Sequence, residues 1–149
     1  MNNLIRTTSD NSDFQSLVKL LDDYLAIKDG NDHSFYAQYN KIDKISNVVV
    51  YYDNQIAVGC GAFKEYDSKT VEIKRMFVHP DYRSKGIGAI ILSELESWAK
   101  ELNYSDSILE TGKRQPEAIH LYQKAGYQII PNYGQYANVE NSLCMKKMI

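Results

Sequence analysis

Cysteine and histidine, the residues that most often form disulfides or ligate transition metals, are scarce in this chain of 149 residues. The two cysteines, Cys60 and Cys144, follow no ligand spacing, and the three histidines are scattered along the sequence. A metal cluster and a disulfide framework are therefore both unsupported, and we expect no metal cofactor. Because unpaired cysteines are usual in reducing compartments, we expect a cytoplasmic location.

An excess of charge of one sign and a long apolar run are also missing. The formal net charge is -2 at pH 7, so we expect no nucleic-acid partner. No apolar stretch is long enough to span a bilayer, and the polar start Met1-Asn2-Asn3 does not resemble a signal peptide. We therefore expect no membrane partner. The length and the ordinary composition fit one domain over residues 1–149.

Hydrophobic periodicity divides the chain into strand-like and helix-like segments. We expect strands at residues 4–7, 47–52, 55–66, 71–78, 107–110, 127–130 and 142–147. We expect a first helix capped by Ser12 and Asp13, a short helix at residues 34–39, and two further helices that begin near Ile87 and Pro116. This order predicts a mixed α/β (α+β) fold with a mostly antiparallel sheet of about seven strands.

The most informative segment joins the strand at 71–78 to the helix that begins near residue 87. It reads Arg83-Ser84-Lys85-Gly86-Ile87-Gly88, a short basic turn with two glycines. The free N–H groups and the dipole of a helix start attract anions, and glycine lets the backbone approach closely, so the segment predicts a diphosphate site. Taken alone, the two glycines also fit a plain strand-to-helix turn. The segment is neither a P-loop nor a Rossmann fingerprint, because Ile91 stands where a third glycine would be.

Two segments together resemble the GNAT superfamily of acetyl-CoA-dependent N-acetyltransferases. Residues 78–88 fit that family's Arg/Gln-x-x-Gly-x-Gly/Ala pattern, and in residues 117–127 a Leu-Tyr pair is followed by Gly126-Tyr127. They occur in the family's order, separated by a strand-sized piece, and the resemblance extends from about Val48 to the C-terminus. It implies the GNAT fold, with helices on both faces of the sheet and with strands 71–78 and 107–110 splayed apart to admit a pantetheine arm.

The resemblance implies that acetyl-CoA is the co-substrate. Its diphosphate would be held by the turn and the helix start, at Arg83, Ser84, Lys85, Gly86, Ile87, Gly88 and Ala89. Backbone groups of Met76, Phe77 and Val78 would hold the pantetheine and polarise the thioester carbonyl. Gln115 stands where the family often has an asparagine that contacts the pantetheine. For Arg83 and Lys85 the alternative is that both are solvated surface residues.

The resemblance also suggests two catalytic residues. Some family members place a glutamate at the position of Glu72 as a base for the amine, and residues 72, 74, 76 and 78 are expected to share one strand face. The alternative for Glu72 is a half-exposed residue paired with Lys74 or Arg75. Tyr122 matches a tyrosine that protonates the leaving thiolate, for which a phenol with a pKa of about 10 is suited. The alternative for Tyr122 is a place in the core.

The acceptor site in this fold is built by the first helical region and by the loop between the last two strands. Here the candidate substrate-binding residues are His33 and Tyr36, together with Tyr133 and Tyr136. These segments are polar and aromatic, which suits a small cation or a polar amine. We therefore expect an N-acetyltransferase that acts on a primary amine of a small molecule by direct attack in a ternary complex. A protein or peptide acceptor and a non-catalytic acetyl-CoA sensor are the alternatives, and a homodimer is left open.

Overall fold

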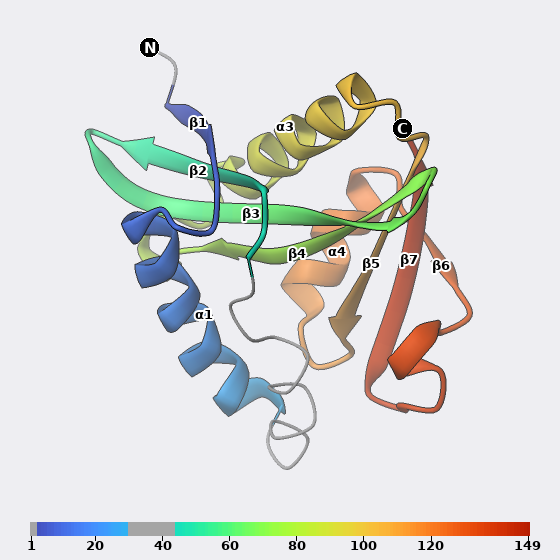
Figure 1. Ribbon diagram of the computed structural model, residues 1–149. Coiled ribbons are helices and arrows are strands. Elements are labelled where there is room, and N and C mark those ends of the chain that lie inside the picture. The colour runs from blue at the N-terminus through green and yellow to red at the C-terminus, as the bar shows by residue number, and fades with distance from the viewer. Residues whose placement is uncertain (1–2, 30–43) are drawn as a thin grey trace.

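A computed structural model describes residues 3–29 and 44–149 of the chain. The strands of these residues are β1 (Leu4–Thr7), β2 (Asn47–Asp53), β3 (Ile56–Asp67), β4 (Thr70–Val78), β5 (Asp106–Gly112), β6 (Gln128–Ile130) and β7 (Ser142–Met148). They form one sheet in the order β1-β2-β3-β4-β5-β7-β6, in which only β4 and β5 are parallel neighbours. The predicted mixed, mostly antiparallel sheet of seven strands is confirmed (Figure 1).

Three α-helices of the described residues cover the two faces of the sheet (Figure 1). Helix α1 (Ser12–Asp29) lies on one face, where its apolar stripe of Phe14, Leu17, Val18 and Leu21 packs on β2 and β3. Helix α3 (Ile87–Glu101) lies on the other face and buries Ile91 and Leu95. Helix α4 (Pro116–Lys124) packs into the same cluster as α3. Helices on both faces were predicted, and this is confirmed.

The ends of several elements differ from those predicted. The side chain of Asn11 accepts a hydrogen bond from the Phe14 N–H at 2.9 Å and caps α1, so the predicted cap at Ser12 and Asp13 is wrong by one residue. Strand β3 begins at Ile56 because the residue before it has a φ of 71° and belongs to the hairpin turn. Strand β5 runs on to Gly112, past its predicted end. The helix predicted at 34–39 lies outside the described residues.

A β-bulge interrupts β4 at Arg75. The residue has a φ of 61°, and the register between β3 and β4 shifts between Cys60 and Ala62. Two contacts hold the bulge in place. The Cys60 thiol donates to the Arg75 carbonyl oxygen at 3.4 Å, and the Arg75 guanidinium pairs with Asp22 of α1 at 3.2 Å. A bulge adds one residue to a strand and so reverses the alternation of its side chains.

The reversal divides β4 between the two faces of the sheet. Before the bulge, Val71 and Ile73 pack in the α3 cluster, so Glu72 and Lys74 face the α1 side. After it, Met76 and Val78 contact the α3 cluster, and Phe77 packs with α1. The expectation that residues 72, 74, 76 and 78 share one face is therefore wrong.

Strands β4 and β5 part soon after they meet. Their parallel pairing covers three residue pairs and ends at Glu72 opposite Ile108. Beyond that point β4 runs on to Val78 and β5 to Gly112 without pairing to each other. The predicted splay between these strands is confirmed. The N–H and C=O groups on the facing edges of β4 and β5 therefore do not pair with each other beyond Glu72. Because strand backbone groups need hydrogen bonds, they are available to another partner.

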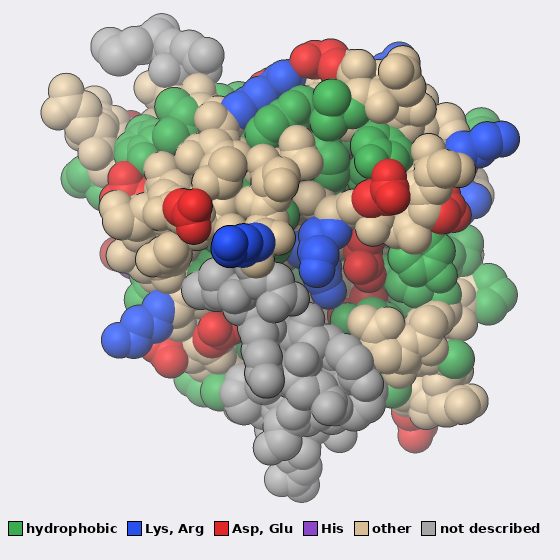
Figure 2. Space-filling view, in the orientation of Figure 1, with side chains coloured by type: hydrophobic (Ala, Val, Ile, Leu, Met, Phe, Trp, Pro, Cys, Tyr) green, Lys and Arg blue, Asp and Glu red, His purple; other side chains and the backbone are tan. Residues whose placement is uncertain are grey.

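The surface of the described residues carries mixed charge. On the face shown in Figure 2, Lys and Arg side chains are interspersed with Asp and Glu. The described helices include none that is long and apolar enough to cross a bilayer.

Leu95→Ala should lower the free energy of unfolding by about 2–5 kcal/mol, because the side chain is fully buried between α3 and the sheet. The matched control is Ile90→Ala on the same helix, where the side chain is 41% exposed. That change should cost about 0.5 kcal/mol or less. Urea unfolding followed by circular dichroism measures both values, and equal losses would contradict the buried face assigned to α3.

Candidate active site

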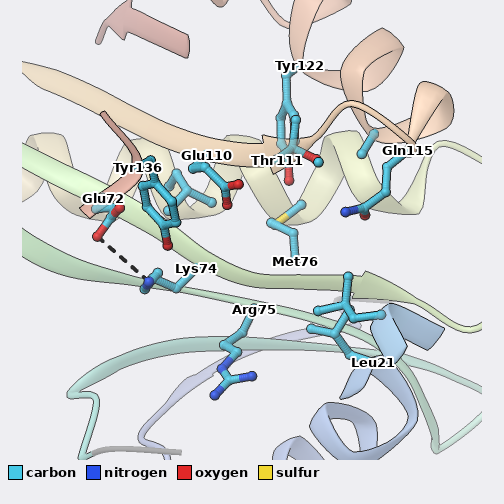
Figure 3. A pocket seen from close by; sticks show the side chains of 14 residues that line it. Leu21, Glu72, Lys74, Arg75, Met76, Glu110, Thr111, Gln115, Tyr122 and Tyr136 are labelled. Carbon is cyan, nitrogen blue, oxygen red and sulfur yellow. Dashed lines mark ion pairs between the residues drawn. The ribbon is translucent and has the colours of Figure 1, made fainter. Parts of the chain in front are cut away.

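A pocket lies where β4 and β5 part. Its walls come from α1, β4, β5, α4 and the loop between β6 and β7: Leu21, Leu25, Glu72, Ile73, Lys74, Arg75, Met76, Glu110, Thr111, Gly112, Gln115, Ala118, Tyr122 and Tyr136. Figure 3 shows two ends. Glu72, Lys74 and Tyr136 gather at one, and Met76, Gln115 and Tyr122 gather at the other.

The Glu72 carboxylate is fixed at the first end of the pocket. Its Oε2 accepts a hydrogen bond of 2.6 Å from the Tyr133 hydroxyl, and its Oε1 lies 3.9 Å from the Lys74 ammonium. The Glu72 side chain is only 13% exposed. The alternative considered from the sequence was a half-exposed Glu72 paired with Lys74 or Arg75. The side chain does pair with Lys74, but it is more buried than that alternative required. Burial and the nearby Glu72 charge raise the pKa of Tyr133, so this phenol stays protonated and keeps donating.

A second carboxylate, Glu110 of β5, lines the same pocket. Its Oε2 accepts a hydrogen bond of 2.8 Å from the Ser142 hydroxyl. Tyr136 is almost fully buried beside it, and burial, followed by the charges of Glu110 and Glu72, raises the pKa of this phenol. The two carboxylates therefore make this end of the pocket attractive to a cationic or protonated amine.

Tyr122 and Gln115 reach the other end of the pocket from α4 and from the residue before it (Figure 3). Tyr122 is 7% exposed, and its ring meets that of Tyr127 edge-on at 6.0 Å. Burial, and secondarily Glu110, raise the pKa of the Tyr122 phenol, which favours the protonated form. Gln115 precedes Pro116 at the helix start, and its side chain makes no capping hydrogen bond. Its amide is thus left to face the pocket.

The predicted anion turn has the backbone that a tight approach to a helix start needs. Ser84 and Gly86 have φ values of 66° and 79°, in the left-handed region that glycine adopts without strain. Helix α3 carries no acidic residue in its first turn, so its positive end is not neutralised from within. At Gly88, a Cβ would come within 3.2 Å of the Leu121 side chain. This second glycine therefore allows α3 and α4 to pack closely.

Arg83 is anchored rather than solvated. Its Nε donates to the Val78 carbonyl oxygen at 2.9 Å, and its guanidinium lies 5.0 Å from the ring centre of Tyr24 and 5.7 Å from that of Phe77. Lys85, in contrast, is exposed, with its ammonium 5.3 Å from the Tyr82 ring centre. Of the two basic residues, Arg83 fastens the turn to the end of β4 and to α1, and Lys85 is placed to add charge to the turn.

The structure brings five of the predicted site residues to the pocket, and those of the turn at 83–89 do not line it. Met76, Gln115, Tyr122, Glu72 and Tyr136 line the pocket, and Tyr133 reaches it through Glu72. The Phe77 side chain points to the α1 face, so only the backbone of this residue could contact a pantetheine arm. His33 and Tyr36 lie outside the described residues. Glu110 was not predicted from the sequence, and Lys74 was considered only as a partner of Glu72. The strand register and the bulge, which are not visible in the sequence, decide which side chains face the pocket.

Arg83→Met should destabilise the free protein by about 1–2 kcal/mol, because it removes one hydrogen bond to Val78 and the contacts of the cation with two aromatic rings. Lys85→Met is the matched control and should cost less, because that side chain is exposed and contacts one ring. Urea unfolding without any ligand measures both. If the two variants lose the same stability, the anchoring of Arg83 is wrong.

The chain is similar to known proteins in sequence and in fold. Over 91 residues, the chain is 38% identical to an IAA acetyltransferase of Azospirillum brasilense, and this match spans 60% of each chain. A crystal structure from Klebsiella pneumoniae, described as a candidate acyl-CoA N-acyltransferase, superposes with a TM-score of 0.83 at 27% identity, over 99% of this chain and 97% of the other.

A second solved structure agrees in fold. The PaiA N-acetyltransferase of Thermoplasma acidophilum, in complex with coenzyme A, superposes with a TM-score of 0.71 at 16% identity, over 98% of both chains. The model of the acetyltransferase (GNAT) family matches residues 14–127, a span that includes β4, the turn, α3, β5 and α4. The resemblance predicted from the two sequence segments is confirmed, and the chain belongs to the acetyltransferase (GNAT) family.

Proposed function

We propose that this protein transfers an acetyl group from acetyl-CoA to a primary amine of a small molecule by direct attack in a ternary complex. One observation carries the proposal. The opening between β4 and β5 holds, in a single pocket, a carboxylate that could take a proton from an amine and a protonated phenol that could give one to a thiolate. Acetyl transfer removes a proton from the amine and adds one to the leaving thiolate, and these two groups could carry the two protons.

The anion turn supports acetyl-CoA as the donor. The first turn of α3 offers unpaired backbone N–H groups with no acidic residue beside them, and Lys85 adds positive charge. When bound, acetyl-CoA would supply the activated acetyl group and the leaving thiol. The chain would hold its diphosphate at residues 83–89 and its pantetheine in the opening. Gln115 is placed to hydrogen-bond an amide there.

The end of β4 offers backbone groups to that arm. The His79 N–H bonds to the Val58 carbonyl oxygen of β3 at 2.8 Å. Because neighbouring residues of a strand point their backbone groups to opposite edges, the Val78 N–H and C=O point into the opening. The Val78 carbonyl oxygen already accepts a hydrogen bond from Arg83 Nε. The Val78 N–H therefore remains for the pantetheine or for the thioester carbonyl, whose developing charge a fixed N–H would stabilise.

Glu72 and Tyr122 divide the proton transfers between the two ends of the pocket. The Glu72 carboxylate accepts a proton from the amine, directly or through one water, while the Tyr133 hydroxyl keeps it in one orientation. Tyr122 donates its phenolic proton to the departing thiolate and recovers one from solvent. The carboxylates at the acceptor end favour an amine over a hydroxyl or thiol acceptor, because an amine can carry positive charge.

Saturating acetyl-CoA should raise the melting temperature by about 5–10 °C at a concentration of about 100 times its Kd. Release of free thiol should then require both acetyl-CoA and an amine from a panel of amines, amino acids, polyamines and peptides. Differential scanning fluorimetry and a thiol assay measure the two effects. No shift in melting temperature would sink the proposal. A shift without thiol release from any acceptor would favour the sensor.

Tyr122→Phe should lower kcat by about 100-fold or more and leave the affinity for acetyl-CoA nearly unchanged, because only the proton donor is lost. Tyr127→Phe is the matched control. Its ring lies next to that of Tyr122, but its hydroxyl bonds to Ser107 Oγ at 2.8 Å, away from the pocket lining. Steady-state kinetics and isothermal titration measure both properties.

The pH profile gives a second readout on the same residue. Burial raises the pKa of Tyr122 above that of a free phenol, so the donor form persists through pH 10. Turnover should therefore show no loss from its ionisation below about pH 10. An unchanged kcat in Tyr122→Phe would make Tyr122 a core residue.

A further inference from the structure

We propose that the acceptor is a zwitterion: a primary amine with a carboxylate on the same or the next carbon, as in an amino acid, with the carboxylate bound by Lys74. This inference rests on the proposed function and names the substrate class of its acceptor end. The observation behind it is a lysine that lies inside the pocket and faces the same side of the sheet as Glu72.

The position of Lys74 is set by the bulge. It is the residue of β4 just before the bulge at Arg75, and its side chain faces the α1 side as that of Glu72 does. Two residues after Lys74, on the far side of the bulge, the strand presents Met76 to the other end of the pocket (Figure 3). The bulge thus places a cation at the acceptor end and an apolar side chain near Tyr122.

The Lys74 ammonium can hydrogen-bond an anionic group of a ligand. Its side chain is 16% exposed, and the contact it makes with the described residues is the ion pair with Glu72 at 3.9 Å, which is too long for a hydrogen bond. Three N–H donors are therefore available. The neighbouring Arg75 is not a substitute, since its side chain is 4% exposed and pairs with Asp22 on α1.

The two carboxylates at this end are already oriented by hydroxyl groups. Tyr133 holds Glu72 at 2.6 Å, and Ser142 holds Glu110 at 2.8 Å. An acceptor amine placed between them would be stabilised by both charges. Because Lys74 lies 3.9 Å from Glu72, the place for an anion adjoins the place for the amine. A ligand that fills both must carry its two charged groups on the same carbon or on neighbouring carbons, as an amino acid does.

The same arrangement disfavours other amines. A polyamine that placed its reacting nitrogen beside Glu72 would bring a second cation toward Lys74, and like charges repel in a partly buried site. An amine without an anionic group would leave the Lys74 ammonium without a hydrogen-bonding partner. A charge-assisted hydrogen bond to the carboxylate should therefore favour the amino acid over its uncharged analogue by about 10- to 100-fold in kcat/KM.

The test compares matched acceptors. The common L-amino acids are offered together with their amides and their decarboxylated amines, and kcat/KM is measured by thiol release. The wild-type protein should prefer the acid by about 10- to 100-fold, and in Lys74→Met this ratio should fall toward one. Since both proteins meet the same pairs, differences in amine basicity cancel. Lys74→Arg, which retains the charge, should keep most of the preference.

Lys100→Met on the exposed side of α3 serves as the control lysine and should leave the ratio unchanged. The melting shift with acetyl-CoA shows that each variant is folded, and Lys74→Gln replaces Lys74→Met if that variant does not fold. Amides and simple amines that react as well as the acids in the wild-type protein overturn the inference and leave the proposed function standing. So does an acid preference that survives both Lys74→Met and Lys74→Gln. Failure of every amine in the panel counts against the proposed function itself.

Discussion

The early parting of β4 and β5 is the constraint on which the active region depends. Two parallel strands normally keep pairing along their length, because their backbone groups need partners. Here pairing ends at Glu72 opposite Ile108, and the strands leave an opening between their inner edges. Residues of α4 close the opening on one side and residues of α1 approach it on the other. A ligand can then take the place that a strand would otherwise fill.

The bulge at Arg75 gives this opening two chemically different ends. It is stabilised by the Cys60 thiol, which donates to its carbonyl oxygen, and by Asp22, which pairs with its guanidinium. Burial raises the pKa of Cys60 to about 12, so the group remains a thiol and a hydrogen-bond donor at neutral pH. The scarce cysteine of this sequence therefore acts as a structural support, with no role as a nucleophile.

The features that were predicted correctly from the sequence are those that depend on residues close together in the chain. The turn at residues 83–88, the helix that follows it and the start of α4 at Pro116 all depend on nearby glycines, a proline and apolar spacing, and all three elements are found. That the turn binds an anion stays a prediction. The bulge was not predictable, because a strand with a regular apolar pattern gives no local sign of an extra residue. Glu110 was missed because its place in the pocket depends on how β5 lies beside β4, and these strands are distant in sequence. His33 and Tyr36 stay predictions.

The hydrogen bond between Tyr133 and Glu72 ties the loop between β6 and β7 to the middle of β4. Its donor stays protonated at neutral pH, since burial and the Glu72 charge raise the pKa of the phenol. The hydrogen bond therefore needs no change in the protonation of Tyr133 at neutral pH. If this end of the pocket binds the acceptor, as proposed, the contact fixes the loop and lowers the entropic cost of binding there. A preformed end with fixed charges of both signs can select its acceptor by charge pattern as well as by size.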